Sequence, residues 1–286
     1  MKFWARIFAI ALTTAALVGA AELGIVYGFD ALRLDRSFVK TGNDWSILLT
    51  WIAWFAIVAV VAGTSHAAAV VKLTQRFSVG ARLTAALAAG IGALVTLVPL
   101  TVYPAVNAKI DANFNAPITV ALTVVGAVGA GVVLGGLVAG NPPLTTGVLV
   151  VALAVWGLGA VSVVATAPTM GRLYLTPVRL GVLDLDSISA VQRAQFSMPA
   201  LAIIAAVVVA LAGRSRRRSR VLIAVCGATG PLTVALAYLI SGPGISHDIT
   251  NQADAYLGAM IAVVVGLIPS MIIALLPASK PAPRSL

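Results

Sequence analysis

Long apolar segments separated by short polar connections follow one another along the chain. A helix needs about 20 mostly apolar residues to cross a bilayer, and eight segments meet or approach that length. They cover residues 3–27, 47–71, 83–104, 117–140, 147–167, 196–213, 221–241 and 256–276. None alternates apolar and polar residues as an outer-membrane β-strand does. The pattern predicts an all-α polytopic membrane protein, with residues 1–286 forming a single transmembrane domain, a bundle of eight helices.

The composition excludes an ordinary soluble domain. Hydrophobic residues make up 60% of the chain and charged residues 10%, with a mean hydropathy of +1.03, whereas soluble domains have about 25% charged residues. The single cysteine rules out a disulfide framework. The preference for Ala, Val, Gly and Arg is typical of high-GC bacteria such as actinobacteria. We therefore expect a bacterial inner-membrane protein.

The charged residues predict the orientation of the spans. If the N-terminus is cytoplasmic, twelve of the nineteen basic residues fall on the cytoplasmic side, with no acidic residue among them. Eight of the nine acidic residues fall on the outer side. Basic residues concentrate on cytoplasmic loops in membrane proteins, so we expect both termini in the cytoplasm. The net charge of +10 then reflects orientation and does not indicate a nucleic-acid partner.

The first span has an alternative interpretation. Lys2 and Arg6, the apolar run that follows and the small residues at 18–20 resemble a cleavable secretory signal. Cleavage would leave seven spans and an exported N-terminus. The apolar stretch continues to Tyr27, longer than a normal signal core, which favours an uncleaved membrane anchor.

Two further features concern the architecture. The outer connection over residues 168–195 contains a Ser/Asp-rich start followed by apolar Ile188 and Val191, which predicts a short interfacial helix over residues 186–193. Residues 32–35 resemble residues 183–186, and residues 99–102 resemble residues 231–234. These similarities are compatible with duplication of a four-helix unit (a four-plus-four arrangement). Because the two pairs are separated by different numbers of residues, the sequence does not decide whether the duplication occurred.

Glu22 is the acidic residue that falls inside a span, about 7 Å of helix rise below the outer end. A carboxylate at that depth is costly unless it is protonated, paired or facing a wet cavity. It is a candidate proton, cation or substrate site. The alternative is a carboxylate at the rim that reaches outward or bonds to a neighbouring helix.

The outer connections contain further candidates for substrate or ion binding. They are Asp35, Asp111, Asp184, Asp186, His247 and Asp248. Their spacings match no standard metal-binding signature, so we predict neither a metal site nor a cofactor. Acidic residues also start helices, and Asp254 is expected to cap the eighth span.

Two motifs predict contacts. Small residues four apart let helices approach closely, and the fourth span has two such pairs, formed by Gly131, Gly135, Gly136 and Gly140. Their partner is another span or another subunit. A cytoplasmic cluster should contact anionic lipid head groups; it contains Arg214, Arg216, Arg217, Arg218 and Arg220.

Three functions remain compatible with the sequence. The first is transport or translocation of a small or lipidic substrate, without an ATPase of its own because the chain has no P-loop motif. The second is a non-catalytic accessory or scaffold subunit that binds other membrane proteins. The third is an outer-leaflet enzyme acting on lipids or glycans, with the outer acidic residues around one groove. We expect a non-enzymatic role.

Overall fold

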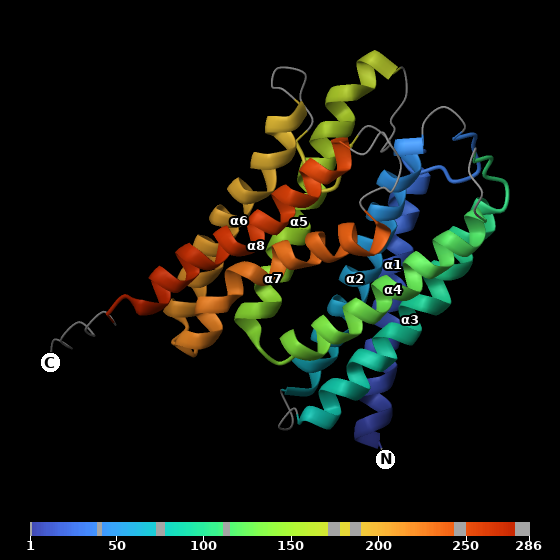
Figure 1. Ribbon diagram of the computed structural model, residues 1–286. Coiled ribbons are helices and arrows are strands. Elements are labelled where there is room, and N and C mark those ends of the chain that lie inside the picture. The colour runs from blue at the N-terminus through green and yellow to red at the C-terminus, as the bar shows by residue number, and fades with distance from the viewer. Residues whose placement is uncertain are drawn as a thin grey trace, which may run out of the picture.

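The computed structural model describes residues 2–38, 42–72, 78–110, 115–170, 178–183, 190–242 and 250–277. Within these residues the chain forms eight α-helices, which Figure 1 shows as a bundle of tilted helices. They are α1 (Lys2–Gly28), α2 (Gly42–Lys72), α3 (Val79–Ala105), α4 (Ala116–Val138), α5 (Pro142–Met170), α6 (Ala190–Ser215), α7 (Arg220–Ser241) and α8 (Thr250–Leu275). All eight are long and apolar enough to cross a membrane. The predicted eight-helix bundle is confirmed.

Most helices extend beyond the predicted spans. The fifth begins at Pro142 and not at residue 147, so the connection from α4 is only three residues long. Proline suits the first positions of a helix, where its missing N–H has no helical partner to lose. The N-terminal end of α1 and the C-terminal end of α8 lie toward the lower side of Figure 1.

Two local predictions differ from the structure. Of the interfacial helix expected over residues 186–193, residues 186–189 lie outside the described part of the chain and residues 190–193 belong to the start of α6. Asp254 is not the cap of α8, because that helix begins four residues earlier at Thr250. Its Oδ1 instead accepts a hydrogen bond from Gln195 Nε2 of α6 over 3.3 Å. The helical pattern continues past the point where hydropathy falls.

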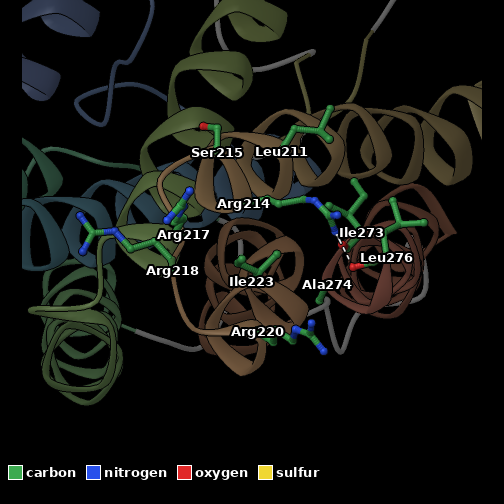
Figure 2. A pocket seen from close by; sticks show the side chains of 10 residues that line it. All are labelled: Leu211, Arg214, Ser215, Arg217, Arg218, Arg220, Ile223, Ile273, Ala274 and Leu276. Carbon is green, nitrogen blue, oxygen red and sulfur yellow. Dashed lines mark hydrogen bonds between the residues drawn. The ribbon is translucent and has the colours of Figure 1, made fainter. Parts of the chain in front are cut away.

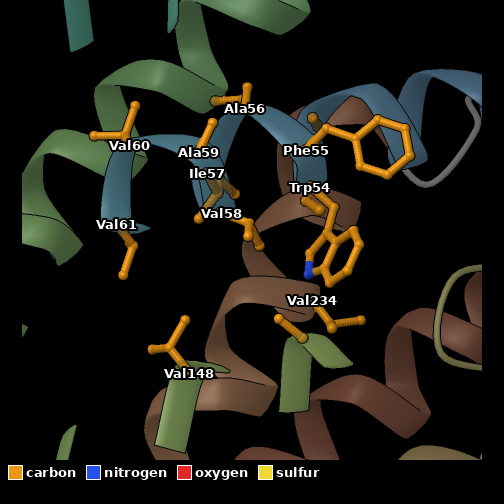
Figure 3. Packing of buried hydrophobic residues seen from close by; sticks show 14 of the residues in the cluster. Trp54, Phe55, Ala56, Ile57, Val58, Ala59, Val60, Val61, Val148 and Val234 are labelled. Atoms are coloured by element: carbon orange, nitrogen blue, oxygen red, sulfur yellow. The ribbon is translucent and has the colours of Figure 1, made fainter. Parts of the chain in front are cut away.

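The helix α2 lies at the centre of the bundle. It packs against α1, α3, α4, α5 and α7, and its residues from Trp51 to Val61 are all buried. Figure 3 shows Val148 of α5 and Val234 of α7 beside this helix. The other helices expose large apolar side chains, such as Leu153 and Val133, as expected of surfaces that face lipid.

The first four and last four helices repeat one pattern of neighbours. In the first half, α1 and α4 each pack on both α2 and α3; in the second half, α5 and α8 each pack on both α6 and α7. The halves meet where α2 and α4 contact α5 and α7. Pro99 of α3 and Pro231 of α7 occupy corresponding helices. The repeated packing fits the four-plus-four duplication, which stays a prediction.

The glycine pairs of α4 face other helices of the same chain. A Cβ atom built on Gly135 would lie 2.9 Å from Thr64 Oγ1, and one built on Gly131 would lie 3.0 Å from Val60 Cβ. Gly136 has ordinary contact with Ala86 of α3, and Gly140 is in the turn after α4 with φ +76°. The row formed by Gly131 and Gly135 therefore packs on α2 and is not available to a second subunit.

Candidate functional site

Glu22 is buried within the membrane-spanning part of α1. Its exposed fraction is 7%, and it lies six residues before the end of α1 at Gly28, a rise of about 9 Å. Trp156 Nε1 of α5 donates to Glu22 Oε1 over 3.5 Å. Glu22 Oε2 is buried and has no hydrogen-bond partner among the described residues. The carboxyl group does not reach outward, but its bond to Trp156 is a bond to a neighbouring helix, so that part of the alternative interpretation stays open.

Aromatic rings surround the indole that contacts Glu22. Phe55 of α2 stacks on Trp156 with ring centroids 5.4 Å apart and an interplanar angle of 16°. Trp51 lies 6.3 Å from the same ring, and it is 5.8 Å from Trp54 in an edge-to-face arrangement. Because bulky rings on α2 hold the position of Trp156, its N–H is fixed toward α1.

An apolar groove lies next to Glu22, between α1 and α5. It has a volume of about 270 Å³ and is lined by Ile25, Val26, Phe29, Ala31, Trp51, Trp156, Gly159, Ala160, Val163 and Val164. Ile25, Phe29 and Val164 are exposed on the outside of the bundle. The groove therefore has the character of a site for an alkyl chain, with Trp156 reaching from its wall to the Glu22 carboxyl group.

The connection between α5 and α6 contains a buried turn over residues 178–183. Val182 N–H donates to the carbonyl of Arg179 over 3.1 Å, and Gly181 has φ +72°, as the third residue of a type II turn requires. A Cβ atom on Gly181 would lie 2.5 Å from Met198 Sδ. Non-helical backbone at membrane depth is tolerated where protein surrounds it, and Val178, Arg179, Leu180 and Val182 are all buried.

Side chains from three helices donate hydrogen bonds to the carbonyl groups of this turn. Trp51 Nε1 donates to Val178 over 2.9 Å, and Tyr238 Oη donates to Leu180 over 2.8 Å. Ser162 Oγ donates to Val182 over 3.4 Å. The turn therefore packs between α2, α5, α6 and α7 and contacts a side chain from each of them. It was predicted only as part of an outer loop, and its burial was missed.

Trp51 connects the buried turn to Glu22. Its ring contacts Trp156, whose N–H is bonded to Glu22, while its own N–H is bonded to Val178. The carboxyl group, two indoles and the backbone of the turn thus form one continuous set of contacts. A change of position at Glu22 has a direct physical route to the turn.

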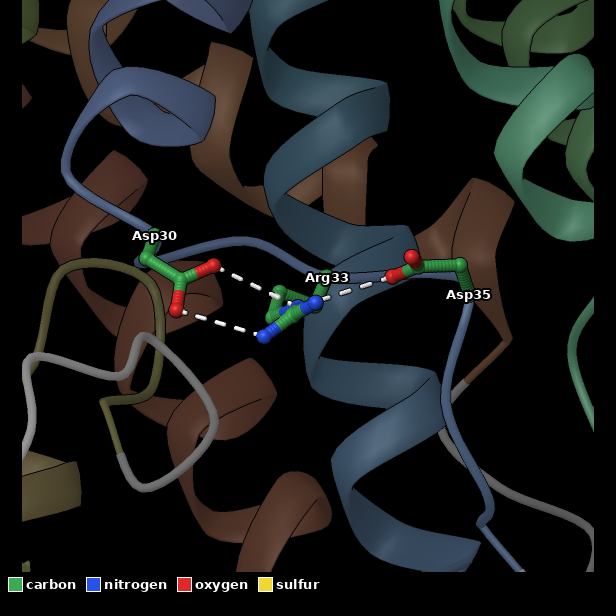
Figure 4. A network of polar contacts seen from close by, with 3 residues as sticks. All are labelled: Asp30, Arg33 and Asp35. Carbon is green, nitrogen blue, oxygen red and sulfur yellow. Dashed lines mark hydrogen bonds and ion pairs between the residues drawn. The ribbon is translucent and has the colours of Figure 1, made fainter.

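Asp35 lies in a different environment. Figure 4 shows Arg33 between Asp30 and Asp35, with N–O distances of 3.3 and 3.6 Å and side chains 40–51% exposed. This network borders a cleft of about 580 Å³ beside Tyr103 and Pro99 of α3. Tyr27 Oη donates to the carbonyl of Leu100 over 3.0 Å, a carbonyl whose helical donor is removed by Pro104. Asp35 therefore does not line the groove beside Glu22.

The remaining predicted outer candidates are not placed by the structure. Asp111, Asp184, Asp186, His247 and Asp248 lie outside the described residues. Among the residues that are described, no group of three His, Cys, Asp or Glu side chains is arranged to hold a metal ion.

A polar cluster at the junction of the two halves was also missed. Thr50 and Ser241 share a hydrogen bond of 2.7 Å, and Gln252 Nε2 donates to Ser46 Oγ over 3.0 Å. These bonds tie the start of α2 to α7 and α8. Single Ser, Thr and Gln residues near span ends give no sequence signal that distinguishes such a cluster from ordinary helix ends.

The arginine cluster lies where α6, α7 and α8 meet (Figure 2). Arg214 donates to the carbonyl groups of Ile273 and Leu276 over 2.8 and 2.9 Å, and also to that of Pro277. Since the last carbonyl groups of a helix have no helical donor, Arg214 caps α8. Arg216, Arg217, Arg218 and Arg220 are exposed.

No protein-family model, curated protein or solved structure matches this chain. Its class therefore follows from the fold. Eight apolar helices in the described residues, each long enough to span a bilayer, make it a multi-pass membrane protein.

Proposed function

We propose that this protein takes part in the transport or translocation of a lipidic or other small amphipathic substrate across a bacterial inner membrane, without an ATPase of its own. The observation that carries the proposal is the Glu22 carboxyl group beside the α1–α5 groove. It is buried, one oxygen has a single long hydrogen bond, and the other oxygen has no partner among the described residues.

The environment of Glu22 explains why a passive role is disfavoured. A charged or half-satisfied carboxyl group inside a membrane is energetically expensive, and such groups commonly belong to ion, proton or substrate pathways. Glu22 takes up a proton, a cation or a hydrogen-bond donor of the substrate to satisfy its oxygens. This supports a role as the coupling group of a transport cycle.

The groove favours a substrate with an alkyl part. Its lining contains apolar side chains, glycine and the two tryptophans, and an apolar ligand gains most from such a surface. The substrate places its polar group near Glu22 and its alkyl chain between Phe29 and Val164. Trp156 and Trp51 connect this site to the buried turn at residues 178–183, so a substrate that displaces Trp156 also acts on the turn.

The proposal is tested with purified protein in vesicles that contain fluorescent phospholipids. Transbilayer movement is measured by chemical quenching of the outer leaflet, for several head groups. We expect movement above that of protein-free vesicles, and Glu22→Gln should lower its rate by about tenfold or more, the equivalent of an interaction of about 1.4 kcal/mol. Asp35→Asn, which neutralises an exposed carboxylate, is the matched control and should keep the rate.

Two results would overturn the proposal. Wild-type protein that moves none of the lipids would exclude a phospholipid-like substrate, and full activity of Glu22→Gln would exclude the coupling role. Two alternative functions remain, an accessory subunit and an enzyme that acts on lipids or glycans. For an accessory subunit, Gly131 and Gly135 are no longer candidate partner contacts, since they pack on α2. The enzyme function depends on acidic residues outside the described part of the chain.

A further inference from the structure

The arginine cluster borders a pocket of about 840 Å³ between the ends of α6, α7 and α8. Arg214, Arg217, Arg218 and Arg220 form its basic lining, and Leu211, Ile223, Ile273, Ala274 and Leu276 form its apolar wall. Figure 2 shows Ile223 on α7, with Arg214 above it and Arg220 below, and Ile223 packs against Gly213 of α6. A polar and an apolar surface therefore meet in one pocket.

Arg214 gives the pocket a fixed wall. Its guanidinium group is held by the carbonyl groups at the end of α8, so α6 and α8 are tied together at this point. Arg217, Arg218 and Arg220 remain exposed, and within the described residues no acidic side chain forms an ion pair with any of them. Three positive charges at the pocket are thus uncompensated by the described protein.

The backbone conformation of Arg217 is the second observation. Arg218 N–H donates to the carbonyl of Gly213 over 3.1 Å, and Arg217 N–H donates to that of Arg214 over 2.9 Å. This is the Schellman arrangement, whose left-handed position usually holds glycine. Arg217 occupies that position with φ +51°. A residue other than glycine in this conformation is unusual and is held there by the surrounding turn.

We propose that this pocket is a binding site for an anionic phospholipid. The head-group phosphate binds among Arg217, Arg218 and Arg220, and an acyl chain lies against the apolar wall. Arginine donates well to phosphate oxygens, and basic pockets between membrane helices suit acidic head groups. Within the wall, Ile223, Ile273 and Ala274 are buried, while Leu211 and Leu276 are 49% and 46% exposed, so the acyl chain contacts chiefly the two leucines at the outer surface of the bundle.

Residues 278–286 carry Lys280 and Arg284 and no acidic side chain, so no side chain of that segment compensates the three arginines. A soluble phosphate compound would satisfy the arginines but leave the apolar wall unused. A phospholipid satisfies both surfaces. This inference is independent of the transport role proposed for Glu22.

The proposal is tested by native mass spectrometry of the full chain in neutral detergent, with dioleoyl phosphatidylglycerol or the zwitterionic dioleoyl phosphatidylcholine added. We expect the wild type to retain the anionic lipid about tenfold more tightly. The variant with Arg217→Gln, Arg218→Gln and Arg220→Gln should lose about that preference. Lys2→Gln with Arg6→Gln removes two exposed charges from the same end of the bundle, away from the pocket, and should retain the preference.

A second measurement keeps the result interpretable. Melting temperatures of all variants in the same detergent identify any that fail to fold, and Arg217→Gly alone should lower lipid retention although its melting temperature does not fall. Equal retention of the two lipids by the wild type would overturn the proposal. So would unchanged retention by the triple variant, or displacement of the lipid by millimolar inorganic phosphate, which would indicate a site for soluble phosphate.

Discussion

Glu22 and Asp35 are close in sequence, but their carboxyl groups lie in opposite environments. Glu22 is buried beside an apolar groove, whereas Asp35 is partly exposed and paired with Arg33. A hydrophobic carbodiimide partitions into apolar sites and reacts with the neutral acid. We therefore expect it to modify Glu22 and to leave Asp35 unmodified, as read by peptide mass spectrometry.

The control for this reaction is Glu22→Gln, which should abolish the modified peptide. Trp156→Phe keeps the stacking on Phe55 but removes the hydrogen bond to Glu22, so we expect modification to increase. Labelling of Asp35 at the same rate as Glu22 would contradict the difference in environment.

Tyr238 provides a second residue-level test, because its hydroxyl group satisfies the carbonyl of Leu180 in the buried turn. Tyr238→Phe leaves that carbonyl without this donor, which should lower the free energy of unfolding by about 1–3 kcal/mol. Tyr256→Phe is the matched control, since its hydroxyl group has no hydrogen bond to any described residue. Equal melting temperatures for the two variants would show that the bond to Leu180 contributes nothing.

For individual residues, the sequence alone identified Glu22 as a candidate but did not identify Trp156 as its hydrogen-bond partner. A lone acidic residue in an apolar span is conspicuous in any hydropathy profile. Trp156 is 134 positions away, and only the packing of α1 and α5 around α2 brings the two together. The same applies to Val178 and Trp51, whose bond depends on a connection that folds back into the bundle.

Among the helices, α5 offers a matched pair of glycines. A Cβ atom on Gly147 would lie 2.5 Å from the Cys226 carbonyl oxygen of α7, whereas one on Gly157 would meet nothing within 4 Å. Gly147→Ala should force α5 and α7 apart and cost about 1–3 kcal/mol. Gly157→Ala should leave the melting temperature unchanged or slightly higher. The opposite order would contradict the observed crossing of α5 and α7.

In the turn between α6 and α7, a substitution is expected to stabilise the protein and not to destabilise it. Arg217 has a left-handed backbone conformation, which costs of the order of 1 kcal/mol for a residue other than glycine. Arg217→Gly should therefore raise the melting temperature in neutral detergent. Arg216→Gly, next to it, is the control and should not do so. A lower melting temperature for Arg217→Gly would mean that its side chain stabilises the turn.

Helices were easier to predict than the segments between them. Each span has about 20 apolar residues, and that length is imposed by the bilayer. The helix ends were displaced because the helices continue into flanking residues of lower hydropathy, with starts at Pro142 and Thr250. The turn at residues 178–183 was assigned to an outer loop, since six residues are too few for a span and composition does not reveal burial.

For the whole molecule, hydropathy did not identify α2 as the central helix. Lipid tails are as apolar as leucine, so a helix surrounded by protein and one surrounded by lipid have similar sequences. The concentration of Trp51, Trp54 and Phe55 on α2 is the clearest sign in retrospect, because large rings fill the space between helices. The internal partner of Gly131 and Gly135 was likewise undetermined until α2 was placed beside α4.

The orientation of the bundle decides which leaflet each proposed site faces, and accessibility of introduced cysteines measures it. Arg33 and Ser219 lie in connections on opposite ends of the bundle, and native Cys226 is buried and should stay unlabelled. The positive-inside rule predicts that the arginine cluster lies on the cytoplasmic side, and on that prediction Arg33→Cys should react with a membrane-impermeant maleimide on intact cells. Ser219→Cys should react only after permeabilisation. The reverse result would place Glu22 in the inner half of the membrane and the arginine pocket outside, away from the anionic cytoplasmic surface that its charge is expected to favour.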